Sequence, residues 1–128
     1  MKRIYLLLLA PLLMSTQCES EEEPVFRTEY FIENNTSTDL AIVLEEAGEV
    51  VIASQSSQFI AVASDFNGFV PPSENIAFSS ITLYRTETGG YEVVAYQQEP
   101  ILDELWRLES EYEYDAAYIL TLTDADLE

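Results

Sequence analysis

The sequence predicts an all-β fold: an immunoglobulin-like two-sheet antiparallel β-sandwich of about seven strands with one short helical crossover. Two observations predict this class. Apolar and polar residues alternate with the two-residue period of half-buried strands, and short turn-forming stretches separate the alternating segments. An eight-stranded β-barrel is the alternative, because the same pattern also fits a closed sheet. The chain has one cysteine, so the disulfide of antibody domains is excluded.

The first and last strands of the expected domain, residues 26–128, show the longest alternation. In "FRTEYFIENN", Phe26, Tyr30 and Ile32 lie on one face, and charged residues occupy the other. The last run is expected to carry a matching inner set: Tyr112, Tyr114, Ala116, Tyr118, Leu120 and Leu122. Each of these strands therefore has one face for the core and one face for water.

Shorter strands are expected between these two. In "DLAIVLEE" the inward residues are Leu40, Ile42 and Leu44, and the preceding "NNTST" is predicted to be a hairpin-like turn. Further strands are expected at "EVVIA", "SQFIAVA", "ITLYR" and "YEVVAY". Gly89 and Gly90 supply the positive φ that a tight hairpin between the last two strands needs.

One segment, "PILDELWRL", departs from the strand pattern. Its apolar residues recur at helical spacing at Ile101, Leu102, Leu105 and Trp106, after Pro100 at a favourable first helical position. We therefore expect one or two helical turns that cross between the sheets, with Trp106 filling one end of the core.

Residues 1–17 have the composition of a signal peptide. Lys2 and Arg3 precede an eleven-residue apolar run, residues 4–14, which is shorter than the roughly 20 residues that span a bilayer. Gln17 is too bulky for an ordinary cleavage site. We therefore expect the lipoprotein route, in which Cys18 becomes the first mature residue and carries acyl chains such as palmitate that anchor it in a membrane.

Residues 18–25 are expected to join this lipid anchor to the domain. After Cys18 the segment is rich in carboxylates: Glu19, Glu21, Glu22 and Glu23. These glutamates have two explanations that the sequence leaves open. They act as an export tag that sends the protein to the outer face of the outer membrane, or they form a plain acidic linker.

The charge balance limits the classes of partner. The chain holds 24 acidic residues, 5 lysines and arginines and no histidine, for a net charge of −19. Such a chain repels nucleic acid, which is therefore excluded as a partner. Solubility and repulsion between crowded neighbours explain the charge most simply, and a specific cationic partner is the alternative.

The sequence contains no catalytic signature. Histidine is absent, and no G-x-S-x-G motif, phosphate-binding glycine loop or His/Cys metal cluster occurs, so we expect neither enzyme activity nor a cofactor. Asp124, Asp126 and Glu128 have the alternate spacing of calcium ligands, but the chain is too short there for an EF-hand loop. We expect a frayed acidic tail and no metal site.

The stretch "SDFNGFVPPSEN", residues 64–75, is the candidate recognition loop. Phe66 and Phe69 flank an Asn67-Gly68 turn, and no strand pattern requires either ring. Beside Asp65 and Asn67, two exposed rings would stack on a glycan or insert into a protein partner. The alternative is that both rings fold back as a lid on the core.

Three segments carry a resemblance: "YFIENNTSTDL", "VAYQQEPILDELW" and "YILTLTDADL". Residues 15–17 before Cys18 resemble a loose form of the lipobox, the sequence that precedes the acylated cysteine of bacterial lipoproteins. Together these features resemble small Bacteroidota (flavobacterial) surface lipoproteins of uncharacterised function. The resemblance implies an all-β fold and a lipid-anchored position in the outer membrane, facing the cell exterior, and it implies no site residues. We expect a non-catalytic binding or accessory module with a glycan or envelope protein as partner. The alternative is a structural or assembly protein of the cell envelope.

Overall fold

The computed structural model describes residues 23–128, which form eight strands in two four-stranded sheets. The strands are β1 (Phe26–Asn35), β2 (Leu40–Leu44), β3 (Gly48–Ile52), β4 (Ser56–Asp65), β5 (Ile81–Thr86), β6 (Glu92–Gln98), β7 (Trp106–Tyr112) and β8 (Asp115–Thr123). Three 3₁₀ turns complete the regular structure of this part of the chain: η1 (Pro72–Glu74), η2 (Asp103–Leu105) and η3 (Asp124–Asp126). No α-helix occurs in residues 23–128.

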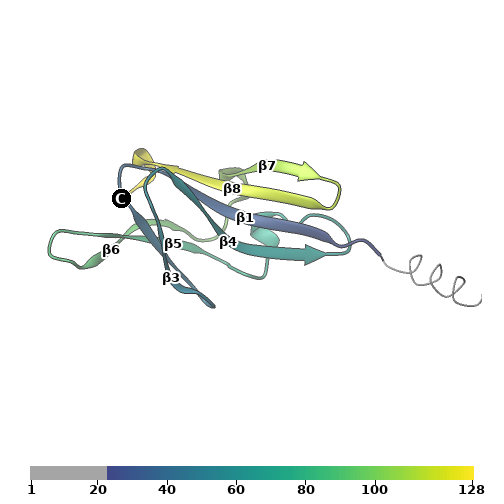
Figure 1. The fold of residues 1–128 in the computed structure, drawn as a ribbon, viewed down its shortest axis with the longest axis horizontal. Helices are drawn as coiled ribbons and strands as arrows, with labels where there is room; N and C mark the ends of the chain where they lie inside the picture. The colour runs from purple at the N-terminus through teal and green to yellow at the C-terminus, as the bar shows by residue number, and fades with distance from the viewer. Residues whose placement is uncertain (1–22) are drawn as a thin grey trace, which may run out of the picture.

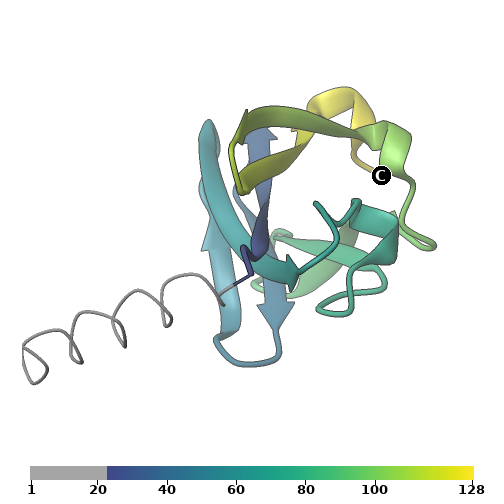
Figure 2. The same cartoon turned by 90° about the vertical axis from the view of Figure 1, so that its right-hand side faces the viewer.

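The two sheets are open, and the architecture is therefore sandwich-like and not a barrel. One sheet has the order β4-β1-β8-β7 and is mixed, because β1 and β8 pair in parallel while the other pairs are antiparallel. The other sheet, β3-β2-β5-β6, is antiparallel throughout. The strands of the mixed sheet run along the long axis of the molecule, whereas β3 is steeply inclined to β5 (Figure 1). Seen along that axis, the sheets surround the interior (Figure 2).

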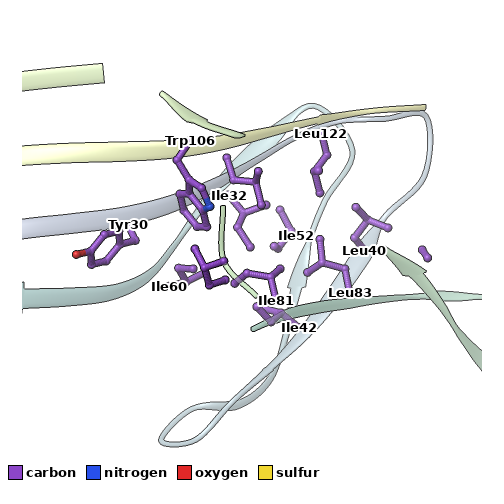
Figure 3. Close-up of a cluster of buried hydrophobic side chains, with 13 residues drawn as sticks. Tyr30, Ile32, Leu40, Ile42, Ile52, Ile60, Ile81, Leu83, Trp106 and Leu122 are labelled. Atoms are coloured by element: carbon purple, nitrogen blue, oxygen red, sulfur yellow. The ribbon is translucent and has the colours of Figure 1, made fainter. Parts of the chain in front are cut away.

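The core lies between the sheets and is built mainly from isoleucine and leucine (Figure 3). The alternation expected for the first strand is confirmed, because Tyr30 and Ile32 of β1 are fully buried while Glu29 and Glu33 are not. β2 contributes Leu40 and Ile42. The other core residues on strands come from both sheets: Ile52, Ile60, Ile81, Leu83, Ala95, Trp106, Leu120 and Leu122. Ile101 joins them from the segment between β6 and η2.

Trp106 is buried, with 5% of its surface exposed, as the sequence predicts. Its ring lies 5.7 Å from that of Phe78 and 6.2 Å from that of Tyr30. Its Nε1 donates a hydrogen bond of 3.0 Å to Oε1 of Gln98, which is itself buried. The polar atom that a buried indole brings into the core is thus satisfied.

The expected helical crossover is wrong in its form. The chain makes a single 3₁₀ turn, η2, and Trp106 already begins the next strand. Leu102 and Leu105 are 43% and 47% exposed, so the helical spacing did not mark a buried helix face. Pro100 does not open a helix either, since it lies outside η2.

The "NNTST" turn is also different from the prediction, because it crosses between the sheets and does not join a hairpin. β1 belongs to one sheet and β2 to the other. The buried side chain of Asn34 organises the crossing: its Nδ2 donates to the carbonyls of Thr38 and Ile52 at 2.9 and 2.8 Å. Its Oδ1 accepts from the Thr36 hydroxyl at 2.6 Å. A polar residue on the inward face of β1 therefore directs the chain into the second sheet.

The last predicted strand is in fact a hairpin turn followed by a strand. Glu113 has a φ of 46° in the turn between β7 and β8, so Tyr112 and Tyr114 flank the turn and are 73% and 44% exposed. The alternation holds from Ala116 onward, where Leu120 and Leu122 are buried. The alternate spacing of Tyr112 and Tyr114 matches the pattern of a strand, although a turn lies between β7 and β8 there. The predicted hairpin at Gly89 and Gly90 is confirmed by the antiparallel pairing of β5 with β6.

Candidate functional site

A groove of about 780 Å³ runs along one side of the sandwich. Three chain segments line most of it: residues 58–62 of β4, residues 42–47 of β2 and the turn after it, and residues 77–82, which lead into β5. Its volume lies within the range of known ligand-binding clefts, roughly 300–1,000 Å³. We call this feature the lateral groove.

The lateral groove opens because β2 and β5 are held together by a single ladder pair, Ala41 with Tyr84. Beyond that pair the two strands diverge, and the β2–β3 hairpin projects away from the body of the molecule (Figure 1). β4 belongs to the other sheet and forms the opposite wall. The groove is therefore a consequence of the topology and not of one displaced side chain.

The lateral groove has an apolar floor and a partly charged rim. Ile42, Ile60 and Ile81 are buried members of the core and reach the groove from below. Glu45 and Glu46 are exposed in the turn at one end. No lysine or arginine is among its lining residues within the described part of the chain. Such a groove favours an apolar ligand that carries positive charge at its edge.

The wall formed by β4 is an edge strand. β4 pairs with β1 on one side and has no neighbouring strand on the other among residues 23–128. Five consecutive residues, 58–62, line the groove, so backbone as well as side chains face it. Phe59 and Val62 are each 40% exposed, and the strand carries no charged side chain before Asp65.

The described arginines do not counter the negative charge of this region. Each is paired with a glutamate two residues further along its own segment: Arg27 with Glu29 at 3.3 Å, Arg85 with Glu87 at 2.7 Å and Arg107 with Glu109 at 2.8 Å. Residues 23–128 contain no lysine. The surface therefore presents excess carboxylates to any partner.

The candidate recognition loop, residues 64–75, is rigidly attached to the core. The Val70 amide donates to Oγ1 of Thr28 at 3.0 Å, and the Val70 carbonyl accepts from the Tyr30 hydroxyl at 2.6 Å. Burial raises the pKa of that tyrosine well above its ordinary value, so it stays a donor at neutral pH. Asp65 accepts from the Asn67 amide at 2.7 Å and closes the turn at the other end.

The two rings of the loop have different environments. Phe66 is 64% exposed, whereas Phe69 is half-buried and meets Phe26 edge to face at 5.2 Å. Phe26 contacts Tyr114 in the same way at 5.2 Å. Neither sequence interpretation describes both rings, because one is free to contact a partner and the other packs against the start of β1. Asp65 and Asn67 lie at the same turn.

The recognition loop lies at the end of the domain where the chain enters it. Phe26, the first residue of β1, pairs with Asp65, the last residue of β4. Any tether that precedes Phe26 therefore begins beside this loop. The lateral groove is reached from the side, along β4, and is lined by none of residues 63–76.

The frayed acidic tail expected at the C-terminal residues is wrong, because their polar groups are hydrogen-bonded to the domain. Oδ1 of Asp124 accepts from the amide and hydroxyl of Ser37, both at 2.9 Å, and these bonds lower the pKa of Asp124. Oδ2 of Asp126 accepts from the Thr123 amide at 2.8 Å. The Glu128 amide donates to the Ala95 carbonyl at 2.8 Å. Asp126 thus caps 3₁₀ turn η3, whereas Asp124 connects that turn to Ser37. Residues 23–128 contain no cluster of His, Cys, Asp or Glu suited to a metal ion.

The lipidation residue Cys18 and the glutamates Glu19, Glu21 and Glu22 lie outside the described residues, as does the predicted signal peptide. Glu23 is described and exposed. Within the described part, no helix is long and apolar enough to cross a membrane.

Sequence reasoning missed the lateral groove. The signal was present in "SSQFIAVASD", a ten-residue strand that lacks charge on both faces up to its last residue. Solvent-exposed edge strands normally carry lysine, glutamate or proline, so this absence marks a strand that has a special environment.

Comparisons of the chain with known protein families, with curated proteins and with solved structures find no match.

Proposed function

We propose that this protein is a surface-anchored bacterial lipoprotein that acts as a non-catalytic binding or accessory module of the outer membrane, and that the lateral groove is its binding site. The groove is the single observation that carries the binding role. It combines a volume of about 780 Å³ with a floor of buried isoleucines and a rim that carries Glu45 and Glu46. Concave apolar sites with a few polar groups are the usual form of a ligand site.

The anchor part of the proposal rests on the sequence around Cys18. If Cys18 is acylated, seven residues lie between it and Phe26, and the eight residue steps from Cys18 to Phe26 span at most about 26–29 Å. The recognition loop beside Phe26 would then face the membrane at close range. The lateral groove would open sideways along the surface, which suits a partner that lies in or on the same membrane, such as an envelope protein.

The anchor is tested with labelled palmitate in the producing cell. We expect the label to enter the wild-type protein and to be lost in Cys18→Ala. Label that persists in Cys18→Ala would contradict acylation at this residue. Replacing Glu19, Glu21, Glu22 and Glu23 with alanine should leave the label in place and make the protein inaccessible to external protease. Unchanged accessibility would mean that the glutamates are only a linker.

The binding role is tested with a variant that fills the groove. Ala77 is exposed and lines the groove, so Ala77→Trp places an indole in it. Ala53 is also exposed but lies outside the groove, so Ala53→Trp is the matched control. Both proteins are screened against arrays of glycans and of peptides. We expect ligands that Ala53→Trp retains and Ala77→Trp loses; arrays that bind both variants equally would overturn the groove as the site.

The second candidate function is that of a structural or assembly protein, and the free edge of β4 favours it. An unpaired edge strand is a template for another strand of the same protein. The charge of the domain opposes self-assembly, because every copy presents excess carboxylates that repel those of the next copy. Sedimentation of the intact protein decides between the two: a monomer supports the binding module, and ordered oligomers support assembly.

We also propose that the sandwich is immunoglobulin-like in architecture only. The orders β4-β1-β8-β7 and β3-β2-β5-β6 differ from the ABED and CFG sheets of a constant immunoglobulin domain. Many sandwich domains share the layered architecture with a different strand order. The parallel pairing of the first and last strands is the feature that separates this chain from the constant-type order.

A further inference from the structure

We propose that the occupant of the lateral groove is an extended segment of a cationic partner protein, which adds to the mixed sheet as a fifth strand along the free edge of β4. This inference rests on the proposed binding role of the groove and specifies its ligand. Three independent features support it: the backbone that faces the groove, the apolar floor, and the sign of the surrounding charge.

The backbone feature comes first. Alternate residues of an edge strand direct their N–H and C=O groups away from the sheet, and an extended peptide can pair with them. The free side of β4 faces the groove along residues 58–62. One carbonyl there, that of Phe59, accepts a 3.0 Å solvent-exposed hydrogen bond from Nε2 of the half-buried Gln58. An incoming peptide amide would replace that side-chain donor.

The floor of the groove then fixes which side chains the strand would carry. Successive side chains of an extended peptide point to opposite faces, so every second one would enter the groove. There it would meet Ile60 and Ile81, which are buried, and Phe78, which is half-buried. Small branched apolar residues fit such a floor. The intervening side chains would point away from the groove to the outer surface.

The charge feature determines the rest of the segment. Glu45 and Glu46 lie at the rim, and all three described arginines are paired with glutamates of their own segments. Lysines or arginines on the outer face of the incoming strand would therefore lie in a negative field with no unpaired arginine nearby in the described part of the chain. Electrostatic complementarity of this kind speeds encounter and selects against acidic partners.

A second copy of this chain does not meet these requirements. A copy could offer β4 itself, but β4 has no basic residue, and the copy brings further carboxylates to the rim. Pairing of β4 with β4 is therefore an outcome that the experiment must distinguish, and a cationic strand of another protein is the occupant that charge favours.

The test uses the full chain in non-ionic detergent micelles, with empty micelles as the blank. The probe is an acetylated and amidated peptide of about ten residues that alternates valine with lysine. Its affinity is measured by fluorescence anisotropy and compared with valine–glutamate and serine–lysine peptides of the same length. We expect the valine–lysine peptide to bind at least about tenfold more tightly than either. Equal binding of the serine–lysine peptide would reduce the interaction to charge alone and overturn the proposal.

Backbone pairing is tested with two N-methylated forms of the probe, one methylated on every valine and one on every lysine. Only one edge of the added strand faces β4, so one isomer should lose binding by about tenfold or more while the other retains it. If both isomers retain binding, the peptide does not form a fifth strand, and the proposal fails. If both lose it, the binding mode involves both edges and is not edge addition.

The location is tested with a matched pair of substitutions. Val62→Lys places on β4 a positive charge, which repels the lysines of the probe. Leu108→Lys places the same charge on β7, the opposite edge of the same sheet. The native residues are 40% and 44% exposed, so both variants should fold. Val62→Lys should weaken the probe about tenfold and Leu108→Lys should not. Equal effects would exclude β4 as the docking edge.

These outcomes separate the inference from the proposed function on which it rests. If the arrays yield a groove ligand that Ala77→Trp abolishes, but the valine–lysine peptide does not bind, the binding module stands and the added strand is wrong. If neither array ligand nor peptide depends on the groove, both fail. If the full chain sediments as a dimer that Val62→Lys dissociates, the edge pairs with a second copy, and the cationic partner is wrong.

Discussion

The two edge strands of the mixed sheet, β4 and β7, differ in how well they are protected against pairing with another strand. An unpaired strand exposes N–H and C=O groups that attract other strands. β7 carries Arg107, Glu109 and Glu111 and is interrupted by a bulge near Leu108. β4 also has a bulge, beside Tyr30 of β1, but carries no charge before its last residue.

The shared bulges show that backbone irregularity does not distinguish the edges, whereas side-chain charge does. A charged edge strand resists pairing with another strand because pairing would bring its charges into contact with an apolar or like-charged neighbour. β7 has that protection. β4 lacks it and borders the lateral groove, as the proposed addition of a partner strand requires.

The largest expected effect tests how each edge is attached to the core. Trp106 opens β7 and is 5% exposed, so Trp106→Ala should lower the free energy of unfolding by about 3–5 kcal/mol. Phe59 of β4 is 40% exposed, so Phe59→Ala should cost only about 1 kcal/mol. Urea denaturation of both variants measures the difference. Equal losses would mean that the Phe59 ring contributes as much to the core as the buried Trp106 ring does.

The sequence predicted the fold class and most strands, whereas the "NNTST" error arises where long-range contacts decide the structure. The alternation in β1 reports burial directly, because Thr28, Tyr30 and Ile32 point inward. Long-range pairing has no comparable local pattern. Nothing in "NNTST" distinguishes a hairpin from a crossing between sheets, because the role of Asn34 depends on its buried hydrogen bond to the Ile52 carbonyl.

The candidate site was predicted less well than the fold. The recognition loop was found because its phenylalanines break the strand pattern, yet Phe66 and Phe69 differ in burial for a reason that lies in Phe26, far away in the chain. The lateral groove depends on which strands face each other across the sheets. The charge-free strand "SSQFIAVASD" marks one wall of the groove, but no local pattern indicates which segments form the other walls.

A second prediction concerns the aromatic contact that connects the ends of the two edges. Phe69 follows β4 and Tyr114 follows β7, and each meets Phe26 edge to face at 5.2 Å. Phe69→Ala should therefore cost about 1–2 kcal/mol, partly through this ring contact. Phe66→Ala, on the same loop, should change stability by less than about 0.5 kcal/mol because the ring is exposed. Thermal melts of the two variants suffice; a marked loss in Phe66→Ala would assign that ring to the core.

A third prediction makes β7 resemble β4. Replacing Arg107, Glu109 and Glu111 with threonine removes the charges of β7 while keeping residues that favour strands. We expect this variant to self-associate in sedimentation velocity at high salt, where the remaining charges are screened. The charge-free edge of β4 is blocked by Val62→Lys in the tested protein, and a protein with Val62→Lys alone is the control. A variant that stays monomeric would show that the bulge alone protects this edge.

The smallest expected effect lies at a point that belongs to neither edge. The Ser37 amide and hydroxyl lower the pKa of Asp124, so its ionised form stabilises the folded state. This contribution is present above the pKa of the unfolded chain and is lost as pH falls through the lower folded pKa, below about pH 4. Asp124→Asn should therefore flatten the acid limb of the stability curve slightly. A curve identical to that of the wild type would show that these bonds contribute nothing.

The position of β1 has a mechanical consequence. β1 is an inner strand, hydrogen-bonded to β4 on one side and to β8 on the other, and the chain enters the domain through it. Tension applied through a preceding tether would act along β1 and shear both ladders at once, since ladder hydrogen bonds lie across the strand direction. A partner strand held on β4 would receive that tension through one further ladder. The domain would thus resist unfolding under hydrodynamic drag better than if the force acted on an outer strand. An outer strand would separate from the sheet one hydrogen bond at a time.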